Sequence, residues 1–264
     1  MKKYIKKLWK DIEYDSESVK TMWNNRAESF SKKADDEEHY ADIKGLVNRL
    51  DNPNEASVLD IGSADGRHSI EFAKHTNNVL GIDIADNMVK IAVENALNSG
   101  IENIEFRNLS WEDADIKKLD WKNKFDLVFA NFSPAIHSSK AVLNMTKASK
   151  QLCYISQHVQ RINTLRDDIL VEFGDYKKST MMRDKIIAAF NTLWEKGYLP
   201  ELTYDRRITK AELLPEDFES FIKSLDLKEP EKALEYLKGI SKNEKLEYEI
   251  IHLNAIMIWD VRNK

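Results

Sequence analysis

A doubly wound α/β fold with a mostly parallel sheet is the architecture that this sequence predicts. Short apolar segments alternate with amphipathic helical patterns, and this alternation is typical of a parallel sheet covered on both faces. These apolar segments lie at 57–62, 78–84, 104–110, 124–132 and 151–156. A final segment, 248–261, reads as a buried strand, and we expect it to return to the sheet as an antiparallel last strand.

The same patterns divide the chain into four predicted regions. Apolar residues at three- and four-residue spacing predict an N-terminal helical cap over residues 1–50. Residues 51–160 hold the alternating strands and helices of a cofactor-binding core, and residues 248–264 hold the final strand. Between them, residues 161–247 predict a long helix, a strand and a helical insertion that serves as a substrate lid.

Composition narrows the class of protein. With 264 residues, 42% of them hydrophobic and 32% charged, the chain predicts a globular protein with a substantial core. The net charge of -5 argues against nucleic acid as a partner. The single cysteine, Cys153, excludes an intrachain disulfide and a thiolate-rich zinc site, so we expect no metal and a cytoplasmic location. No apolar run is long enough to predict a membrane span, and no pattern indicates the oligomeric state.

A glycine-rich turn follows the first predicted strand, in the segment VLDIGSADG (58–66). Ligands of open parallel sheets bind beyond the carboxyl ends of the strands, where such a turn lets the backbone approach them. The turn has Gly62, Ala64 and Gly66, which matches neither the G-x-G-x-x-G dinucleotide fingerprint nor a phosphate-binding P-loop. A nicotinamide-dependent oxidoreductase therefore remains an alternative that this spacing disfavours.

An acidic residue, Asp83, ends the second predicted strand in the same crevice. Its carboxylate is placed to accept hydrogen bonds from the two hydroxyls of a ribose. A different interpretation makes Asp83 the N-cap of the following helix, a role that Asp86 can also fill. The combination of the turn and the acid favours a nucleoside ligand.

The order of these motifs resembles that of class I S-adenosylmethionine-dependent methyltransferases with a Rossmann-like core. The segments that carry the resemblance are WNNRAESF (23–30), VLDIGSADG, GIDIADNM (81–88), NLSWED (108–113) and KFDLVFANFSPAI (124–136). Ala64 departs from the family, in which a glycine is usual. The resemblance implies S-adenosylmethionine as cofactor, with S-adenosylhomocysteine as product.

The resemblance also implies roles for individual residues. Near the methionine part of the cofactor it implies Asp60, Gly62, Ser63, Ala64 and Gly66. It implies Asp83 at the ribose, and around the adenine it implies Ile84, Met88, Ser110, Trp111 and Glu112. Beside the sulfonium it implies Asn131 and Phe132. Trp111 is equally open to interpretation as a core residue.

His137 follows the fourth predicted strand, at the end of the sheet where the transferable methyl group is expected. Methyl transfer is an in-line displacement, and a general base is needed only when the acceptor must lose a proton. His137 is our candidate for that base, with Asn131 as a second catalytic candidate and His39 and Tyr40 as weaker ones. A plain helix-start residue is the other interpretation of His137.

These observations predict a methyltransferase that acts on a small-molecule acceptor. The absence of a recognisable basic or aromatic nucleic-acid-binding module favours a small molecule. The nearest alternative is an RNA or protein methyltransferase, which predicts an open, basic groove beside the fourth strand. A further alternative is a protein that binds S-adenosylmethionine without transferring its methyl group.

Overall fold

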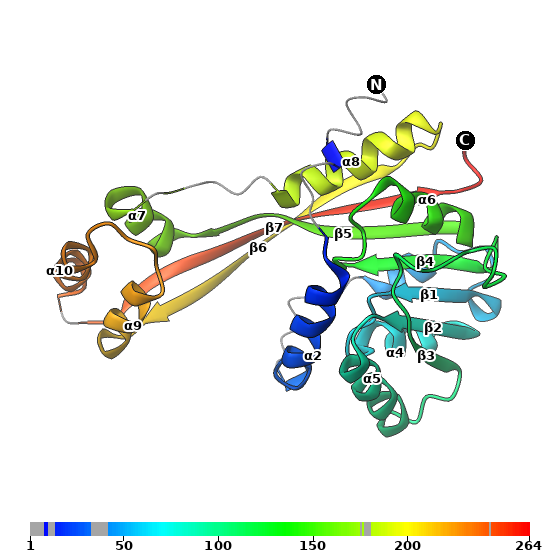
Figure 1. The fold of residues 1–264 in the computed structure, drawn as a ribbon, viewed down its shortest axis with the longest axis horizontal. Helices are drawn as coiled ribbons and strands as arrows, with labels where there is room; N and C mark the ends of the chain where they lie inside the picture. Colours follow the sequence, from blue (N-terminus) through cyan, green and yellow to red (C-terminus); the bar gives the residue numbers. More distant parts are fainter. Residues whose placement is uncertain (1–7, 10–13, 33–41, 175, 177–180, 243) are drawn as a thin grey trace. The chain divides into compact units, whose positions relative to one another are not determined.

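The computed structural model describes residues 8–9, 14–32, 42–174, 176, 181–242 and 244–264, and for Met181 and Met182 the backbone alone. Its sheet has seven strands in the order β3-β2-β1-β4-β5-β7-β6 (Figure 1). The strands are β1 (Ser57–Ile61), β2 (Asn78–Asp83), β3 (Ile104–Asn108), β4 (Phe125–Asn131), β5 (Ser149–Asn163), β6 (Glu201–Leu213) and β7 (Leu246–Asp260).

Strands β1 to β5 are parallel, and the sheet grows outward from β1 in both directions. β1 pairs with β2 on one side and with β4 on the other, with Leu59 opposite Leu80 and Val128. β2 then pairs with β3, and β4 with β5. The strand order therefore reverses at β1, and the carboxyl ends of β1 and β4 flank this switch point, where ligands of such sheets bind. The last strands are antiparallel, which confirms the predicted doubly wound fold with an antiparallel final strand.

The described residues form two compact units. The first takes in the chain up to Gln157 together with Asp184–Thr203 and Ile256–Lys264, and the second comprises His158–Arg183 and Tyr204–Ala255. Helices of the first unit are α2 (Ser16–Lys32), α3 (Ile43–Val47), α4 (Arg67–Ala73), α5 (Asp86–Asn98), α6 (Ser139–Ala148) and most of α8 (Met181–Glu195). Helices of the second unit are α7 (Thr164–Phe173), α9 (Phe218–Lys223) and α10 (Pro230–Ser241).

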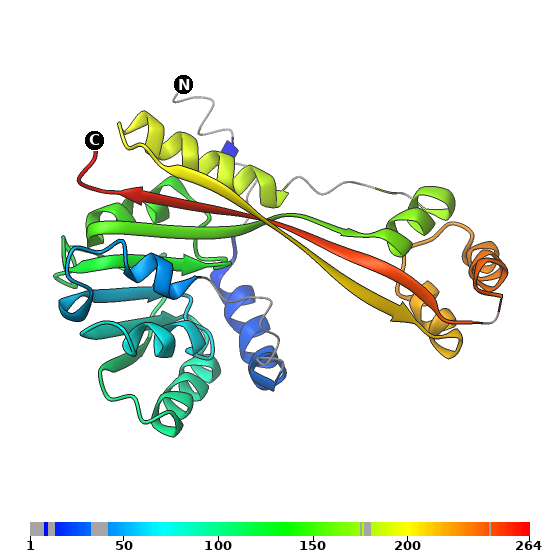
Figure 2. The same cartoon turned by 180° about the vertical axis from the view of Figure 1, so that it is seen from behind.

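The core of the first unit lies against the middle of the sheet. Val58, Leu127 and Phe129 are fully buried, and Phe129 stacks on Tyr154 with 4.6 Å between ring centroids. Burying an aliphatic or aromatic side chain of this size contributes about 2 kcal/mol, which is why the central strands have apolar residues on both faces. Helix α2, drawn in blue, can be followed from behind in Figure 2. It packs on α5 through the buried Ala27.

The second unit has a separate apolar core. Ile169 of α7, Phe218 and Ile222 of α9, and Leu237 of α10 are buried together. Figure 1 shows α7, α9 and α10 gathered around one end of the paired β6 and β7. The predicted helical insertion before the last strand is therefore present.

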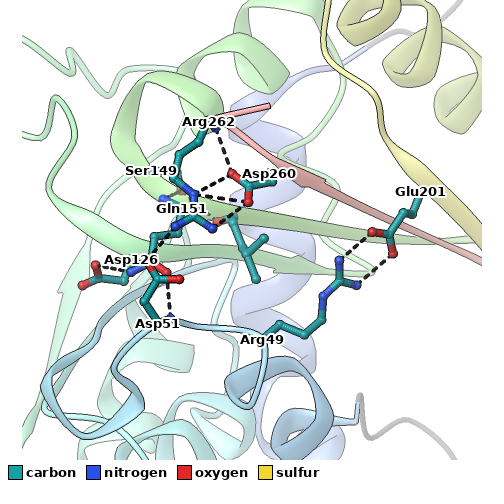
Figure 3. A network of polar contacts seen from close by, with 9 residues as sticks. Arg49, Asp51, Asp126, Ser149, Gln151, Glu201, Asp260 and Arg262 are labelled. Carbon is teal, nitrogen blue, oxygen red and sulfur yellow. Dashed lines mark hydrogen bonds and ion pairs between the residues drawn. The ribbon is translucent and has the colours of Figure 1, made fainter. Parts of the chain in front are cut away.

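A polar network closes the end of the first unit where β1, β4 and β5 begin (Figure 3). Gln151 accepts from the backbone N–H of Asp51 at 3.0 Å and donates to Asp126 at 3.0 Å. Arg262 pairs with Asp51 and Asp260, each at 2.7 Å. Because most of these side chains are partly exposed, each pair stabilises the fold only slightly.

Two strands are longer than the sequence predicts. The apolar pattern predicts β5 over 151–156 and β6 over 201–207, whereas the strands run over Ser149–Asn163 and Glu201–Leu213. Both extensions contain several polar or charged residues, as in HVQRIN (158–163), so the apolar pattern used for the inner strands stops short of them. Residues 1–7, 10–13 and 33–41 of the predicted helical cap lie outside the described residues.

Candidate functional site

The turn after β1 adopts the conformation that its glycines permit. Gly62, Ala64 and Gly66 have φ of 75°, 49° and 81°, in the left-handed region. The backbone N–H of Gly62 donates to the carbonyl of Ile82 at 2.8 Å, which ties the turn to the end of β2. A Cβ on Gly62 would lie 2.4 Å from Oγ of Ser133, so glycine is required there by close packing as well as by φ. Ala64 has a Cβ and therefore carries conformational strain.

Asp83 lies at the end of β2 and is held by backbone donors from two segments. Its carboxylate accepts from the N–H of Ala64 at 3.0 Å and from the N–H of Ala85 at 2.8 Å. Burial raises the pKa of Asp83 above its usual range. Asp86 is the first residue of α5 and pairs with Lys20 at 2.9 Å, so it does not cap the helix from outside. The fixed Asp83 carboxylate keeps further lone pairs for other donors.

Asp60 lies beneath the turn, where it is 2% exposed. Its carboxylate accepts from the hydroxyl of Ser69 at 2.6 Å. Burial raises the pKa of Asp60 to about 7, and the charges of Asp83 and Asp65 add to this rise. Asp65 is itself paired with Arg67 at 2.7 Å. The turn therefore brings together three acidic side chains and one guanidinium.

Four buried polar atoms of the described residues have no hydrogen-bond partner. They are Oγ of Ser63, Oγ of Ser110, Oε2 of Glu112 and Nε2 of His137. Buried polar atoms are normally satisfied, so an unsatisfied one calls for an explanation such as a role in binding a ligand. All four belong to residues that the sequence singled out for cofactor binding or catalysis.

The residues predicted for the adenine are buried to different degrees. Ile84 is half-buried, whereas Met88 is 1% exposed and packs with Ala27 of α2. Trp111 is 3% exposed, and its indole N–H donates to the carbonyl of Ala141 at 3.2 Å. Met88 and Trp111 thus have the packing of core residues, and their roles as adenine contacts stay predictions.

The end of β4 carries the two residues predicted for the sulfonium. The side-chain carbonyl of Asn131 accepts from the hydroxyl of Ser156 at 2.5 Å, and its amide nitrogen lies 3.3 Å from Nε2 of His68. Phe132 has a φ of 49°, which is strained for a bulky residue. Strained backbone of this kind clusters at functional sites, and here both Ala64 and Phe132 show it at predicted site positions.

His137 lies in a cluster of ionisable groups that the sequence did not bring together. Its Nε2 is 3.1 Å from Oε2 of Glu112, and its ring stacks on Tyr14 with centroids 3.8 Å apart and an interplanar angle of 6°. Burial lowers the pKa of His137, the charge of Glu112 raises it and that of Lys185 lowers it. Tyr14 and Lys185 were not predicted as site residues, because each lies in a segment without a motif.

The weaker catalytic candidates, His39 and Tyr40, lie outside the described residues. Across the described ranges, no group of three or more His, Cys, Asp or Glu side chains is placed to hold a metal ion. No described helix has both the length and the apolar character needed to cross a membrane.

Comparison with known structures and sequences agrees with this geometry. The crystal structure of the YcgJ protein from Bacillus subtilis superposes with a TM-score of 0.50 and 15% identity, covering 82% of this chain and 97% of that chain. A putative methyltransferase from Bacillus halodurans gives a TM-score of 0.50 at 15% identity, covering 83% of this chain and 98% of that one. These similarities concern the fold.

Sequence relatives match shorter segments. The release factor glutamine methyltransferase of Aliivibrio fischeri is 36% identical over 81 residues, which cover 30% of this chain and 27% of that protein. The uncharacterized methyltransferase YcgJ of Bacillus subtilis is 28% identical over 131 residues, 46% of this chain and 50% of that protein. The chain thus spans half or less of the length of these curated relatives.

The fold and the turn between β1 and α4 define a class I methyltransferase architecture, as the resemblance implied. A family model described as a methyltransferase domain matches residues 53–198, more than half of the chain. The chain therefore belongs to this methyltransferase family.

Proposed function

We propose that this protein transfers the methyl group of S-adenosylmethionine to a small-molecule acceptor. The observation that carries the proposal is the pair of unsatisfied buried hydroxyls on Ser63 and Ser110, whereas the buried atoms of Glu112 and His137 face each other at 3.1 Å. A polar ligand that lies along the carboxyl ends of β1, β2 and β4 would supply partners for such atoms.

The residues around the turn fit the chemical groups of this ligand. Asp83 has lone pairs for the two ribose hydroxyls, and the ionised form of Asp60 would suit a ligand that carries an ammonium and a sulfonium. The methionine part would lie by Gly62, Ser63, Ala64 and Gly66, and the adenine by Ile84, Met88, Ser110 and Trp111. When bound, S-adenosylmethionine supplies a methyl group on a sulfonium, which is a good leaving group.

The catalytic part of the proposal concerns His137 and Asn131. His137 would take a proton from the acceptor, because its imidazole is buried beside a carboxylate and its pKa is lowered by burial. Asn131 and Phe132 would line the reacting methyl group. Most of the rate enhancement would come from orienting donor and acceptor and excluding water.

The acceptor is proposed to be small because the chain has a net charge of -5 and no evident nucleic-acid-binding module. In this proposal residues 1–50 and 161–247 serve as cap and lid, and the protein is cytoplasmic, in keeping with its single cysteine. Relatives named as release factor and 23S rRNA methyltransferases favour a protein or RNA acceptor as the second candidate.

Calorimetric titration with S-adenosylmethionine, S-adenosylhomocysteine and NAD tests the cofactor without knowledge of the acceptor. We expect both adenosyl ligands to bind and NAD not to bind. Asp83→Asn should weaken both by at least about tenfold, because a charged acceptor of two hydroxyl donors becomes neutral. Asp86→Asn is the matched control, since this exposed acid is on the helix surface, and it should leave affinity unchanged. Binding of NAD alone, or equal affinity in Asp83→Asn, would refute the proposal.

A further inference from the structure

Helix α8 carries one lysine, Lys185, on the face that packs against the rest of the first unit. Positions i, i+3, i+4 and i+7 of a helix share one face, and counted from Lys185 these positions are Ala188, Ala189 and Thr192. All three of these residues are buried. Lys185 therefore lies on the buried face of α8, and it is itself partly buried. Lysines removed from water in this way are normally paired with an acid.

Thr192 shows what this face of α8 packs against. Its hydroxyl accepts from the indole N–H of Trp9 at 3.1 Å and donates to the carbonyl of Ala188 at 2.8 Å. Because the hydrogen of Thr192 goes to Ala188, Thr192 accepts from the hydroxyl of Ser139, which is 3.2 Å away. Ser139 is the first residue of α6. The buried face of α8 therefore lies against the start of α6.

Lys185 is close to the loop that follows β4. It precedes Thr192 by two helical turns, which is about 10 Å along the axis of α8. Burial lowers the pKa of His137, the charge of Glu112 raises it, and the charge of Lys185 lowers it. His137 comes two residues before Ser139, after the strand end where the methyl acceptor is expected. The ammonium of Lys185 is therefore within electrostatic range of the acceptor end of the proposed site.

No acid offsets the charge of Lys185 in the part of the chain that the structure describes. Its ammonium takes part in no hydrogen bond or ion pair with a described residue, and burial lowers its pKa without any neighbouring charge that raises it. Glu112, the acid beside His137, faces the imidazole at 3.1 Å and Lys140 at 3.7 Å. A partly buried ammonium without a counter-charge disfavours folding, so its presence calls for an explanation such as a bound anion.

We propose that Lys185 binds a carboxylate of the methyl acceptor, so that the acceptors of this protein are small carboxylic acids. This inference rests on the proposed function, and it adds a substrate class that no motif in the sequence specifies. The single charge of one ammonium matches the single charge of a carboxylate. Phosphate carries more charge and is typically bound by several donors, such as an arginine fork or the N–H groups at a helix N-terminus.

The charges around the site also favour one orientation of such an acceptor. Burial raises the pKa of the Tyr14 hydroxyl, and the charges of Glu112, Asp83 and Asp113 add to this rise. The cofactor side of the proposed site is therefore acidic and repels a carboxylate, whereas Lys185 attracts it on the side of α8. An acceptor bound in this way directs its carboxylate toward α8 and the rest of the molecule toward the ends of β1 and β4.

Lysine NMR with acetate as the probe tests this site without knowledge of the acceptor. The protein is labelled with ¹³C at lysine Cε and saturated with S-adenosylhomocysteine, and Lys185→Met identifies the signal of Lys185. We expect a Lys185 pKa below the ordinary lysine range, and we expect acetate to raise it because a carboxylate stabilises the charged form. Acetamide has nearly the same shape without the charge and should leave the pKa unchanged. Sodium chloride keeps the ionic strength constant throughout.

Lys185→Met keeps most of the side-chain length and removes the charge. Acetate affinity, measured from backbone amide shifts, should fall by at least about tenfold, as expected for the loss of a charge-assisted hydrogen bond. Without acetate the variant should unfold at a higher temperature than the wild type, because an uncompensated cation has been removed. Lys196→Met is the matched control, since Lys196 directly follows α8 and is exposed, and it should change neither quantity.

Three results would overturn the inference. They are equal acetate affinity in the wild type and Lys185→Met, tighter binding of inorganic phosphate than of acetate, and a Lys185 pKa in the ordinary lysine range. The last result would show that only the stem of Lys185 is packed and that its ammonium lies in water. Titration of the same samples with S-adenosylhomocysteine separates the two proposals. A wild type that does not bind this ligand contradicts the proposed function, whereas normal binding with no response of Lys185 to acetate contradicts only the carboxylate site.

Discussion

The backbone N–H of Ala64 donates to the carboxylate of Asp83 at 3.0 Å, which joins the turn after β1 to the end of β2. These two residues are nineteen positions apart in the chain, and both were predicted as site residues. The bond holds the acid beside the turn, in which Ala64 has a φ of 49°. The strained backbone of Ala64 and the fixed position of the Asp83 carboxylate are therefore linked by this hydrogen bond.

Replacing Ala64 by glycine should stabilise the protein slightly. The left-handed conformation costs alanine about 1–2 kcal/mol, and glycine gives back roughly 0.4–1 kcal/mol through the entropy of the unfolded chain, so we expect a net gain of up to about 1 kcal/mol. Urea denaturation measures it. Ala85→Gly is the control, because Ala85 has an extended φ of -90° and its replacement should destabilise. Equal losses in both variants would contradict a strained Ala64.

Ser63→Ala should change stability and binding in opposite directions. Its buried hydroxyl has no partner in the ligand-free protein, so removing it should stabilise by about 1 kcal/mol, while affinity for S-adenosylhomocysteine should fall roughly three- to tenfold. Thermal unfolding and calorimetry measure the two effects. Ser69→Ala should instead destabilise the free protein, because it removes the hydrogen bond to Asp60. A destabilised Ser63→Ala that binds normally would show that Ser63 is structural.

Gly62→Ala should destabilise the fold by more than backbone strain alone. Gly100 provides the comparison, since it has a φ of 66° and open space where an added Cβ would lie, so Gly100→Ala should cost about 1 kcal/mol. At Gly62 the new Cβ would lie 2.4 Å from Oγ of Ser133, which should add roughly 1–3 kcal/mol. Adding Ser133→Gly to Gly62→Ala should recover part of this loss, and a strictly additive double variant would rule out the contact as its cause.

Asp60 should make the protein less stable as pH rises. Its pKa of about 7 in the folded state lies above the ordinary 3.8, so the folded state holds the proton longer and stability is lost between about pH 4 and 7. Asp60→Asn cannot ionise and should gain on the wild type across this window, by up to about 4 kcal/mol at pH 8. Denaturation at pH 4 to 8 measures the difference, and a constant difference would contradict the raised pKa.

Asp126→Asn should change stability with pH in the direction opposite to Asp60→Asn. Despite partial burial, hydrogen bonds from Ser57, Gln151 and Lys150 lower the pKa of Asp126, so its ionised form contributes stability above the ordinary carboxyl range. The Asp126→Asn variant should therefore lose stability relative to the wild type as pH rises, which the same denaturation series measures. The two variants together separate a buried acid whose pKa is raised from a hydrogen-bonded acid whose pKa is lowered.

Much of the first unit could be predicted from the sequence, because its signals are local. β1, β2 and β4 each have a central run of apolar residues, and Gly62 and Gly66 mark the turn where φ is positive. The prediction missed the outer parts of β5 and β6 because it relied on runs of apolar residues, and these parts contain several polar or charged residues.

The sequence by itself determined the fold class, the order of the strands' motifs and the residues along the β1 and β2 ends. Only the tertiary structure decided which distant groups meet: Tyr14 against His137, Glu112 facing the same imidazole, and Ser133 filling the space beside Gly62. Strand and turn signals depend on neighbours a few positions apart. Contacts between residues from different strands depend on how the loops after β1, β3 and β4 come together at the carboxyl ends of the strands. A pattern of neighbouring residues does not predict this arrangement.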